Sequence, residues 1–238
     1  SAGKVYWLKV YELPLAGSGS RGRPIVNLLP LGEGERVSAV LPVREFAADR
    51  YVLFATRRGL VKKTALADYS RPRSAGIIAL DILEGDALVD VALTGGSDHV
   101  LLFTDDGKVL RFDERDVRVM GRDARGVRGM SVRDDQAVIG MVVAQADGDI
   151  LTVTANGYGK RTPLADYPLR GRGGMGVISI QTTARNGQVV GAVQVAADAE
   201  VMLVTNAGTA IRTKVASISL LGRNTQGVKL MGVGEGEQ

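Results

Sequence analysis

The chain has 238 residues with no cysteine and one histidine, and its 30 Lys and Arg against 26 Asp and Glu give a formal net charge of +4. The absence of cysteine excludes disulfides, cysteine-ligated metals and thiolate catalysis, and a single histidine excludes a multi-histidine metal site. No stretch approaches the roughly 20 apolar residues of a membrane span, and the first residues lack a signal-peptide core. We therefore expect a cytoplasmic protein without a membrane partner.

Short apolar segments recur along the chain, and most of them follow a glycine turn. The first, "GKVYWLKV", begins at Gly3. Four later turns have the pattern Thr-x-x-Gly and are separated by 48, 50 and 51 residues: "TRRGLVKKT" at Gly59, "TDDGKVLRF" at Gly107, "TANGYGKRT" at Gly157 and "TNAGTAIRT" at Gly208. About 19 residues after most of these glycines, a second glycine opens another apolar run, at Gly22, Gly76, Gly126, Gly176 and Gly227. Two landmarks in fixed phase indicate a repeat protein.

The pattern within each repeat predicts short β-strands. Residues 99–112, "HVLLFTDDGKVLRF", read as two strands around a turn in which Gly107 supplies the positive φ of a tight hairpin. Residues 149–162 and 200–213 repeat this design, and further runs at 176–182 and 189–195 bring a repeat to about four strands. We predict an all-β, propeller-like domain over residues 1–238, with blades of about 50 residues starting near residues 3, 59, 107, 157 and 208 and an incomplete last repeat.

Positive charge is concentrated in one part of every repeat. The segments between the first and second landmark glycines hold 20 of the 30 Lys and Arg but only 7 of the 26 Asp and Glu, a net of +13, and the remainder has a net of −9. Equivalent parts of equivalent blades face the same way, so this segregation predicts a basic band along one rim, which is typical of nucleic-acid binding. The alternative interpretation is that exposed hairpins carry Lys and Arg as edge protection.

Duplex DNA is the predicted nucleic-acid partner, because only 4 Phe, 6 Tyr and 1 Trp are available to stack on single-stranded bases. Arg- and Gly-containing loops such as "SRPRSAG", "GRDARG", "LRGRGG" and "GRNTQG" can place guanidinium groups near phosphates. We interpret Tyr69 and Tyr167 as packing residues. The candidate DNA-binding residues are Arg21, Arg23, Lys62, Lys63, Arg71, Arg73, Arg111, Arg122, Arg125, Lys160, Arg161, Arg170, Arg172, Arg212, Lys214 and Arg223.

Patterns of cofactor or catalytic sites are weak. Residues 17–22 and 171–176 satisfy G-x-G-x-x-G, but neither opens a helix in a βαβ unit, and no Gly-Lys pair has P-loop spacing. His99 starts a predicted strand, and the carboxylates gather in acidic runs that solvated loops explain. We expect no cofactor, no metal and no catalytic residue.

The strings "RGRPIVNLLPL", "NGYGKRT", "RNGQVVGAVQV" and "GRNTQGVKL" closely resemble the C-terminal domain of the bacterial DNA gyrase A subunit, over about residues 4–230. The resemblance implies a β-pinwheel, a propeller-like disc whose blades exchange a strand with their neighbours. It also implies a non-catalytic domain that wraps duplex DNA around a basic perimeter, so that gyrase introduces negative supercoils. The implied partners are the B subunit of gyrase together with the remainder of the A subunit in an A2B2 assembly, in the nucleoid of the bacterial cytoplasm, and the isolated domain is expected to be monomeric.

Two departures from that family pattern are visible. The family's basic box, Gln-Arg-Arg-Gly-Gly-Lys-Gly, is expected in a blade that precedes this chain, and its nearest relative here, "RGRGGMG", has Met175 at the lysine position. We therefore expect five of the usual six repeats. The alternatives are the C-terminal domain of the topoisomerase IV A-type subunit, or a propeller-like protein-interaction platform.

Overall fold

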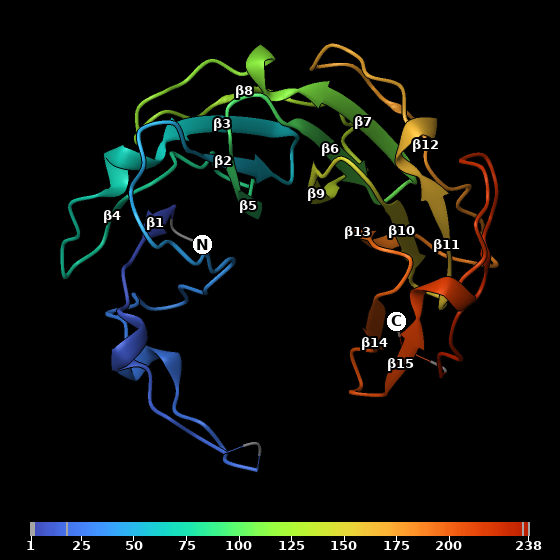
Figure 1. Ribbon diagram of the computed structural model, residues 1–238, viewed down its shortest axis with the longest axis horizontal. Helices are drawn as coiled ribbons and strands as arrows, with labels where there is room; N and C mark the ends of the chain where they lie inside the picture. The colour runs from blue at the N-terminus through green and yellow to red at the C-terminus, as the bar shows by residue number, and fades with distance from the viewer. Residues whose placement is uncertain (1–2, 18, 235, 238) are drawn as a thin grey trace.

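The computed structural model describes residues 3–17, 19–234 and 236–237, and in this part of the chain all long elements are β-strands (Figure 1). The helices among these residues are single 3-10 turns. The strands are β1 (Lys4–Val5), β2 (Tyr51–Thr56), β3 (Leu60–Ala65), β4 (Ile77–Ile78), β5 (Leu88–Thr94), β6 (His99–Thr104), β7 (Lys108–Asp113), β8 (Val127–Arg128), β9 (Val138–Ala144), β10 (Asp149–Thr154), β11 (Tyr158–Pro163), β12 (Val177–Ile178), β13 (Val189–Val195), β14 (Glu200–Val204), β15 (Ala210–Lys214) and β16 (Val228–Lys229). The 3-10 turns are η1 (Val10–Glu12), η2 (Ile25–Asn27), η3 (Leu66–Tyr69), η4 (Glu114–Asp116), η5 (Leu164–Asp166) and η6 (Val215–Ser217).

Three complete blades are four-stranded antiparallel sheets, and each borrows its fourth strand from the next repeat. Their strand orders are β5-β2-β3-β8, β9-β6-β7-β12 and β13-β10-β11-β16. The fourth strand pairs with the hairpin of the preceding repeat, as in Val61 opposite Val127 and Val109 opposite Val177. The predicted all-β fold with strand exchange between four-stranded blades is confirmed.

The blades follow an arc, with β5, β9 and β13 on its inner side and the exchanged strands on its outer side (Figure 1). The repeats at the two ends of the arc differ from the prediction of four strands per repeat. In the first repeat β1 pairs with β4, and the described residues between 6 and 50 form two 3-10 turns and irregular structure. In the last repeat, β14 and β15 form a two-stranded sheet. Four of the seven prolines lie within residues 1–50, where they remove ladder hydrogen bonds and disfavour extended strands.

The two landmark glycines meet at each junction between blades. Gly107 has φ +86° in the β6–β7 turn, and its carbonyl accepts hydrogen bonds from Ser179 N (2.8 Å) and Ile180 N (3.2 Å) of the next repeat. Gly176, with φ +76°, opens the strand that arrives there, and a Cβ on it would lie 2.4 Å from Val109 O. The threonine of the Thr-x-x-Gly pattern closes the turn, because Thr104 Oγ accepts from Lys108 N (3.1 Å). The fixed phase of the landmarks therefore reflects strand exchange.

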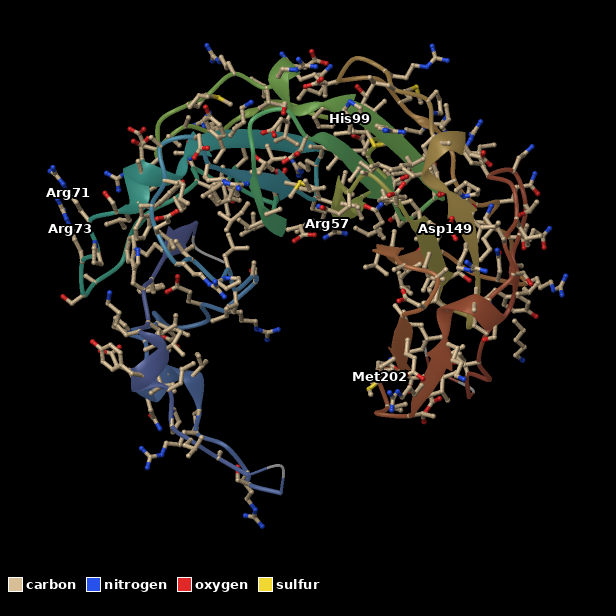
Figure 2. All side chains as sticks on the ribbon, in the orientation of Figure 1. Arg57, Arg71, Arg73, His99, Asp149 and Met202 are labelled. Atoms are coloured by element: carbon tan, nitrogen blue, oxygen red, sulfur yellow. The ribbon has the colours of Figure 1, made fainter. Side chains whose placement is uncertain are left out.

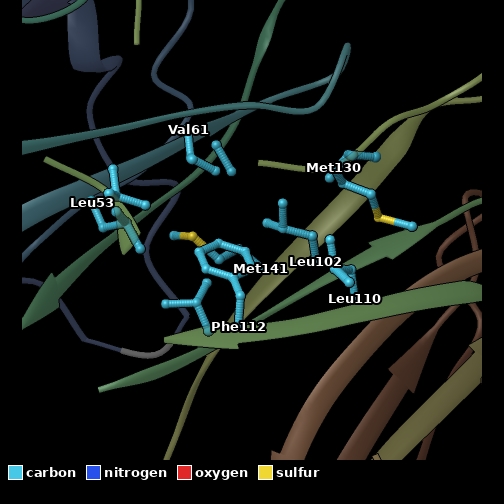
Figure 3. Packing of buried hydrophobic residues seen from close by; sticks show 11 residues of the cluster. Leu53, Val61, Leu102, Leu110, Phe112, Met130 and Met141 are labelled. Atoms are coloured by element: carbon cyan, nitrogen blue, oxygen red, sulfur yellow. The ribbon is translucent and has the colours of Figure 1, made fainter. Parts of the chain in front are cut away.

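The hydrophobic core lies between blades. One cluster joins Leu53 and Val61 of the first complete blade to Leu102 and Phe112 of the second, with Met130 beside them (Figure 3). A second cluster joins the second and third blades in the same way. Because the sheets of the three complete blades are packed on both faces, these blades are held in equivalent orientations and present equivalent loops at the outer edge.

Candidate nucleic-acid interface

Four arginine-containing loops lie at the outer edge of the arc, and we call them the perimeter loops: residues 70–76, 119–126, 169–176 and 220–227. The last three begin beside the third strand of the preceding blade, where Val119, Leu169 and Leu220 form parallel bridges with Lys63, Arg111 and Arg161. Each of the three then swings outward and returns as the exchanged strand β8, β12 or β16. Both ends of each loop are thereby fixed to the outer side of a blade.

Arginines of these loops face solvent. Arg71, Arg73, Arg125, Arg170 and Arg172 are exposed, and Figure 2 shows Arg71 and Arg73 projecting away from the ribbon. Two further loop arginines, Arg122 and Arg223, are half-buried. Each of these loops therefore brings one or two arginines to the outer surface, although their positions within the loop differ.

Hydrogen bonds to the main chain orient some of these arginines. Arg172 Nε donates to Asp116 O (2.8 Å) and a terminal nitrogen donates to Arg128 O (2.9 Å). Arg223 donates to Ile178 O (2.8 Å) in the same way. A guanidinium has five N–H donors, so groups held by one or two bonds still present donors to a phosphate in a fixed geometry.

Arg125 is the one exposed loop arginine that the structure pairs with a carboxylate in the described residues. Its Nε lies 2.5 Å from the Asp81 carboxylate, and both side chains are substantially exposed. Exposed pairs of this kind are worth about 0–1 kcal/mol. A phosphate can therefore compete with Asp81 for the guanidinium of Arg125.

Lys62 and Lys160 are not available to DNA, contrary to the prediction from sequence. Both side chains are fully buried, at 0% exposure, three residues after the turn glycines of their hairpins. Burial lowers the pKa of each ammonium group from 10.5 to about 8. A phosphate cannot reach these groups, and we exclude both lysines from the interface.

The next position along each hairpin carries three cations that tie adjacent blades together, and we call Lys63, Arg111 and Arg161 the seam cations. Lys63 is buried and the two arginines are half-buried. Each donates to main-chain carbonyls at the 3-10 turn of the following repeat: Lys63 Nζ to Glu114 O (2.8 Å), Arg111 to Leu164 O and Tyr167 O (3.1 Å each), and Arg161 Nε to Ile218 O (2.9 Å). Because these side chains are engaged inside the seam, we exclude them as well.

The single histidine and one acidic residue support the seam cations. His99 Nδ1 lies 2.9 Å from a terminal nitrogen of Arg111, and since a guanidinium only donates, Nδ1 accepts. Asp149, at the equivalent position one repeat later, accepts from Arg161 at 2.8 Å. Figure 2 places both residues on the blades. His99 therefore has a structural role at the seam.

The remaining candidates lie outside the perimeter loops. Arg212 and Lys214 are exposed on β15, where Arg212 pairs with Glu200 of β14. Arg21 and Arg23 are exposed in the irregular first repeat. The structure does not bring these four residues onto the outer loops.

The two tyrosines predicted to pack do so. Tyr69 is 4% exposed and donates to Ala79 O (3.2 Å), and Tyr167 is 1% exposed with its hydroxyl 3.2 Å from Ser179 Oγ. Burial raises the pKa of Tyr69 to about 12. Neither ring is available as a stacking platform for a base.

Two arginines that sequence reasoning missed extend the basic edge. Arg118 and Arg128 are exposed on either side of the 119–126 loop. Arg128 follows Val127 in β8, and the alternation of side chains along a strand places it on the opposite face. That alternation was the available signal, because Arg128 lies two residues after the second landmark glycine, Gly126.

Other kinds of site find no support in the described residues. Within them, no group of three or more His, Cys, Asp or Glu residues is arranged to hold a metal ion. Nor does any described helix combine the length and apolar character that crossing a bilayer requires.

Comparison with known proteins gives a family match over nearly the whole chain. The family model described as "DNA gyrase C-terminal domain, beta-propeller" matches residues 1–44, 50–94, 98–145, 148–196 and 199–238. The DNA gyrase A subunit of Salmonella typhimurium is 56% identical and that of Escherichia coli K12 is 52% identical, each over 237 residues. The alignments cover 100% of this chain but 27% of each relative. The chain thus spans about a quarter of the length of these relatives.

Solved structures show the same architecture. The C-terminal domain of DNA topoisomerase IV superposes with a TM-score of 0.88 at 28% identity, covering 97% of this chain and 72% of that one. The DNA gyrase A C-terminal domain superposes with a TM-score of 0.86 at 25% identity, covering 98% and 76%. Structural likeness alone does not separate the two kinds of protein, whereas the sequence relatives described above are gyrase A subunits.

Proposed function

The chain belongs to the DNA gyrase C-terminal domain family, and on this premise we propose that it binds duplex DNA along the perimeter loops and wraps it around the outer edge of the arc. The observation that carries the proposal is the recurrence of exposed arginines on equivalent loops of successive blades. The proposed contacts at the outer edge are Arg71, Arg73, Arg118, Arg122, Arg125, Arg128, Arg170, Arg172 and Arg223. Arg212 and Lys214 on β15 extend this DNA track beyond the perimeter loops.

The chemistry of these loops favours backbone contact over base reading. Guanidinium groups bind phosphates through charge-assisted, often bidentate hydrogen bonds that carry no base information by themselves. The described residues offer no α-helix for the major groove. DNA that follows contact points along an arc has to bend, so flexible sequences are preferred only because they deform at lower cost.

In a longer gyrase A chain, this wrap would give strand passage its direction. We propose that a fixed path around the arc gives the crossing between the wrapped DNA and the next DNA segment a fixed handedness. ATP-driven strand passage through that crossing then introduces negative supercoils. The chain itself supplies binding and no catalytic residue. Its partners are then the B subunit of gyrase together with the remainder of the A subunit, in the bacterial cytoplasm.

The test is the salt dependence of binding to a random-sequence duplex. Each phosphate contact contributes a log–log slope of about −0.9, so Arg71→Ala with Arg73→Ala should flatten the slope by about 1.8. Both side chains are exposed, and the free energy of unfolding should change by less than about 0.5 kcal/mol. Fluorescence anisotropy across a salt series measures the slope.

The matched control removes charge outside the basic part of a repeat. Asp134→Asn with Asp135→Asn alters two exposed carboxylates in the loop between β8 and β9. This variant should keep the wild-type slope. A folded arginine double variant with an unchanged slope, or a wild-type chain that fails to bind random duplex, would overturn the proposal and favour a protein-interaction platform.

A further inference from the structure

One buried position distinguishes the three complete blades. It lies three residues after the turn glycine, on the third strand of each sheet, and carries Lys62 in the first blade, Leu110 in the second and Lys160 in the third. All three side chains are 0–2% exposed. Two of the three blades therefore place an ammonium group where the third places an alkyl chain.

Each ammonium group lies beneath a perimeter loop and donates to that loop's main chain. Lys62 Nζ donates to Arg122 O and, at 2.5 Å, to Ala79 O. Lys160 Nζ donates to Gly222 O at 2.5 Å and to Arg223 O at 2.6 Å. In both cases the accepting loop belongs to the next repeat, and one accepting carbonyl is that of a proposed DNA-contacting arginine.

The charge of these lysines is buried without direct neutralisation. Among the described residues no ion pair joins either ammonium group to a carboxylate. The charged groups that influence Lys62 are Asp68, Asp123 and Arg122, and its Nζ lies 5.3 Å from the centroid of the Phe54 ring. Asp166 and Arg223 influence Lys160. Burying an incompletely paired charge costs free energy. The ammonium group offsets this cost by donating hydrogen bonds to main-chain carbonyls, which an alkyl chain cannot do.

The blade with Leu110 holds its perimeter loop differently. There Ser131 Oγ donates to Gly173 O (2.8 Å), and Gly173 N donates to Gly129 O (2.6 Å). In the other two loops the residues equivalent to Ser131 are Asp81 and Gln181. Their backbone N–H groups donate to Ala124 O and Thr225 O, as Ser131 N does to Gly174 O, and their side chains contact Arg125 and Asn224. A side-chain donor thus reaches a main-chain carbonyl of the loop in each complete blade. What distinguishes the two blades with a lysine is that this donor is a buried ammonium group.

We infer that Lys62 and Lys160 are positioning residues, which fix the perimeter loops 119–126 and 220–227 from beneath and so set where their arginines meet a phosphate. The inference rests on the proposed function for its DNA part. Its structural part concerns the free protein, and the two can be tested separately.

Limited trypsin digestion tests the structural part, because the loops contain their own cleavage sites at Arg122, Arg125, Arg170, Arg172 and Arg223. Cleavage of a transiently open loop tracks the open population. Lys62→Met should raise cleavage at Arg122 and Arg125 by about 5–10-fold, and Lys160→Met should do the same at Arg223. Each variant should leave the other loop unchanged, and Leu110→Met should change none. Mass spectrometry assigns and times the cuts.

The DNA part is tested with the Lys62→Met, Lys160→Met double variant. Affinity for random duplex should fall about 3–10-fold with an unchanged salt slope, because the lysines hold the loops and do not contact phosphate. Equal cleavage rates, equal affinity, or a slope reduced by about 1.8 would each overturn the inference. If a Met variant does not fold, Gln at the same position, whose side chain is shorter than that of lysine and ends in an uncharged amide NH2, should give the same order of effects. A wild-type chain that does not bind duplex refutes the proposed function, while the digestion still decides the role of the lysines.

Discussion

The seams between blades and the perimeter loops use the same residue types in opposite ways. In a seam, Lys63, Arg111 and Arg161 donate to main-chain carbonyls of the next repeat and are buried or half-buried. In a perimeter loop, arginines such as Arg71 and Arg170 are exposed. The distance of a cation from the turn glycine, and not its charge, therefore determines whether it binds main-chain carbonyls in a seam or faces solvent in a perimeter loop.

This difference separates folding from binding in the molecule. Substitutions at a seam should reduce the free energy of unfolding, and substitutions in a perimeter loop should reduce DNA binding at nearly constant stability. The buried lysines Lys62 and Lys160 lie between the two regions, because they belong to a strand but hold a loop. A substitution in a perimeter loop is therefore the control for a substitution at a seam, and the reverse also holds.

The largest effect is expected from Gly107→Ala at a seam. A Cβ there would lie 2.2 Å from Ile180 O, and φ is +86°, so the substitution has both a backbone clash and an unfavourable conformation. We expect a loss of about 3 kcal/mol or more in the free energy of unfolding, measured by urea denaturation. Gly171→Ala is the matched control in a perimeter loop, where nothing lies within 4 Å of the added Cβ.

The control should stay within about 1 kcal/mol of wild type. Equal losses in the two glycine variants would show that the seam glycines are not required by close approach of the blades. The comparison between seams and loops would then lose its structural basis.

A pH series gives an intermediate effect and probes the buried lysines. Burial lowers the pKa of Lys62 and Lys160 to about 8 in the folded chain, below the ordinary 10.5. Between these values the unfolded chain holds protons that the folded chain has released, so the free energy of unfolding should rise with pH. Relative to the Lys62→Met, Lys160→Met variant, we expect wild type to gain up to roughly 1 kcal/mol per pH unit for each lysine above pH 8.

Urea denaturation of both proteins at about pH 7.5, 8.5, 9.5 and 10.5, which covers the interval between the folded pKa of about 8 and the ordinary value of 10.5, measures that difference. The subtraction removes titrations that the two chains share. A difference that stays flat, or that falls as the pH rises, would contradict a lowered pKa and with it the burial of the charges.

The repeat, the hairpins and the packing tyrosines could be predicted from the sequence because each has a local cause. Gly107 and Thr104 close a turn with bonds inside a few residues, and the apolar run beside them is sufficient to predict strands. The four perimeter loops lie within the segments that the sequence shows to be rich in Lys and Arg. What the sequence could not resolve was which cations in that part are exposed.

The reason lies in the way the blades cover one another. In a sheet with one solvated face, side chains alternate between buried and exposed, so at least one of Lys62 and Lys63 should be accessible. Here both faces of β3 are packed against neighbours, and Val61, Lys62, Lys63 and Thr64 are all buried in succession. The prediction of four strands was wrong for the first repeat for a different reason. Its apolar runs resemble those of the other repeats, but four of the seven prolines lie within residues 1–50 and disfavour strand pairing there.

The smallest effect separates two arginines of the same loop. Arg172 donates to Asp116 O and Arg128 O, so it both orients the 169–176 loop and faces solvent. Arg170 is bound through its backbone N–H, which donates to Arg111 O, and its side chain is exposed. Each Arg→Ala variant should flatten the salt slope for duplex binding by about 0.9, the contribution of one phosphate contact. Arg172→Ala should also lower the free energy of unfolding by about 0.5–1 kcal/mol for its two partly solvated hydrogen bonds, whereas Arg170→Ala should not change it measurably.

Urea denaturation and anisotropy titrations on the same preparations of the Arg170 and Arg172 variants give both quantities. Equal stability of the two variants would mean that Arg172 does not hold the loop, because the Arg172 side chain donates to main-chain carbonyls and the exposed Arg170 side chain is not seen to do so among the described residues. A slope change for only one of them would mean that the DNA path touches a single arginine of this loop. The track would then have to pass on one side of the loop, and the wrap would be narrower than the full set of exposed arginines suggests.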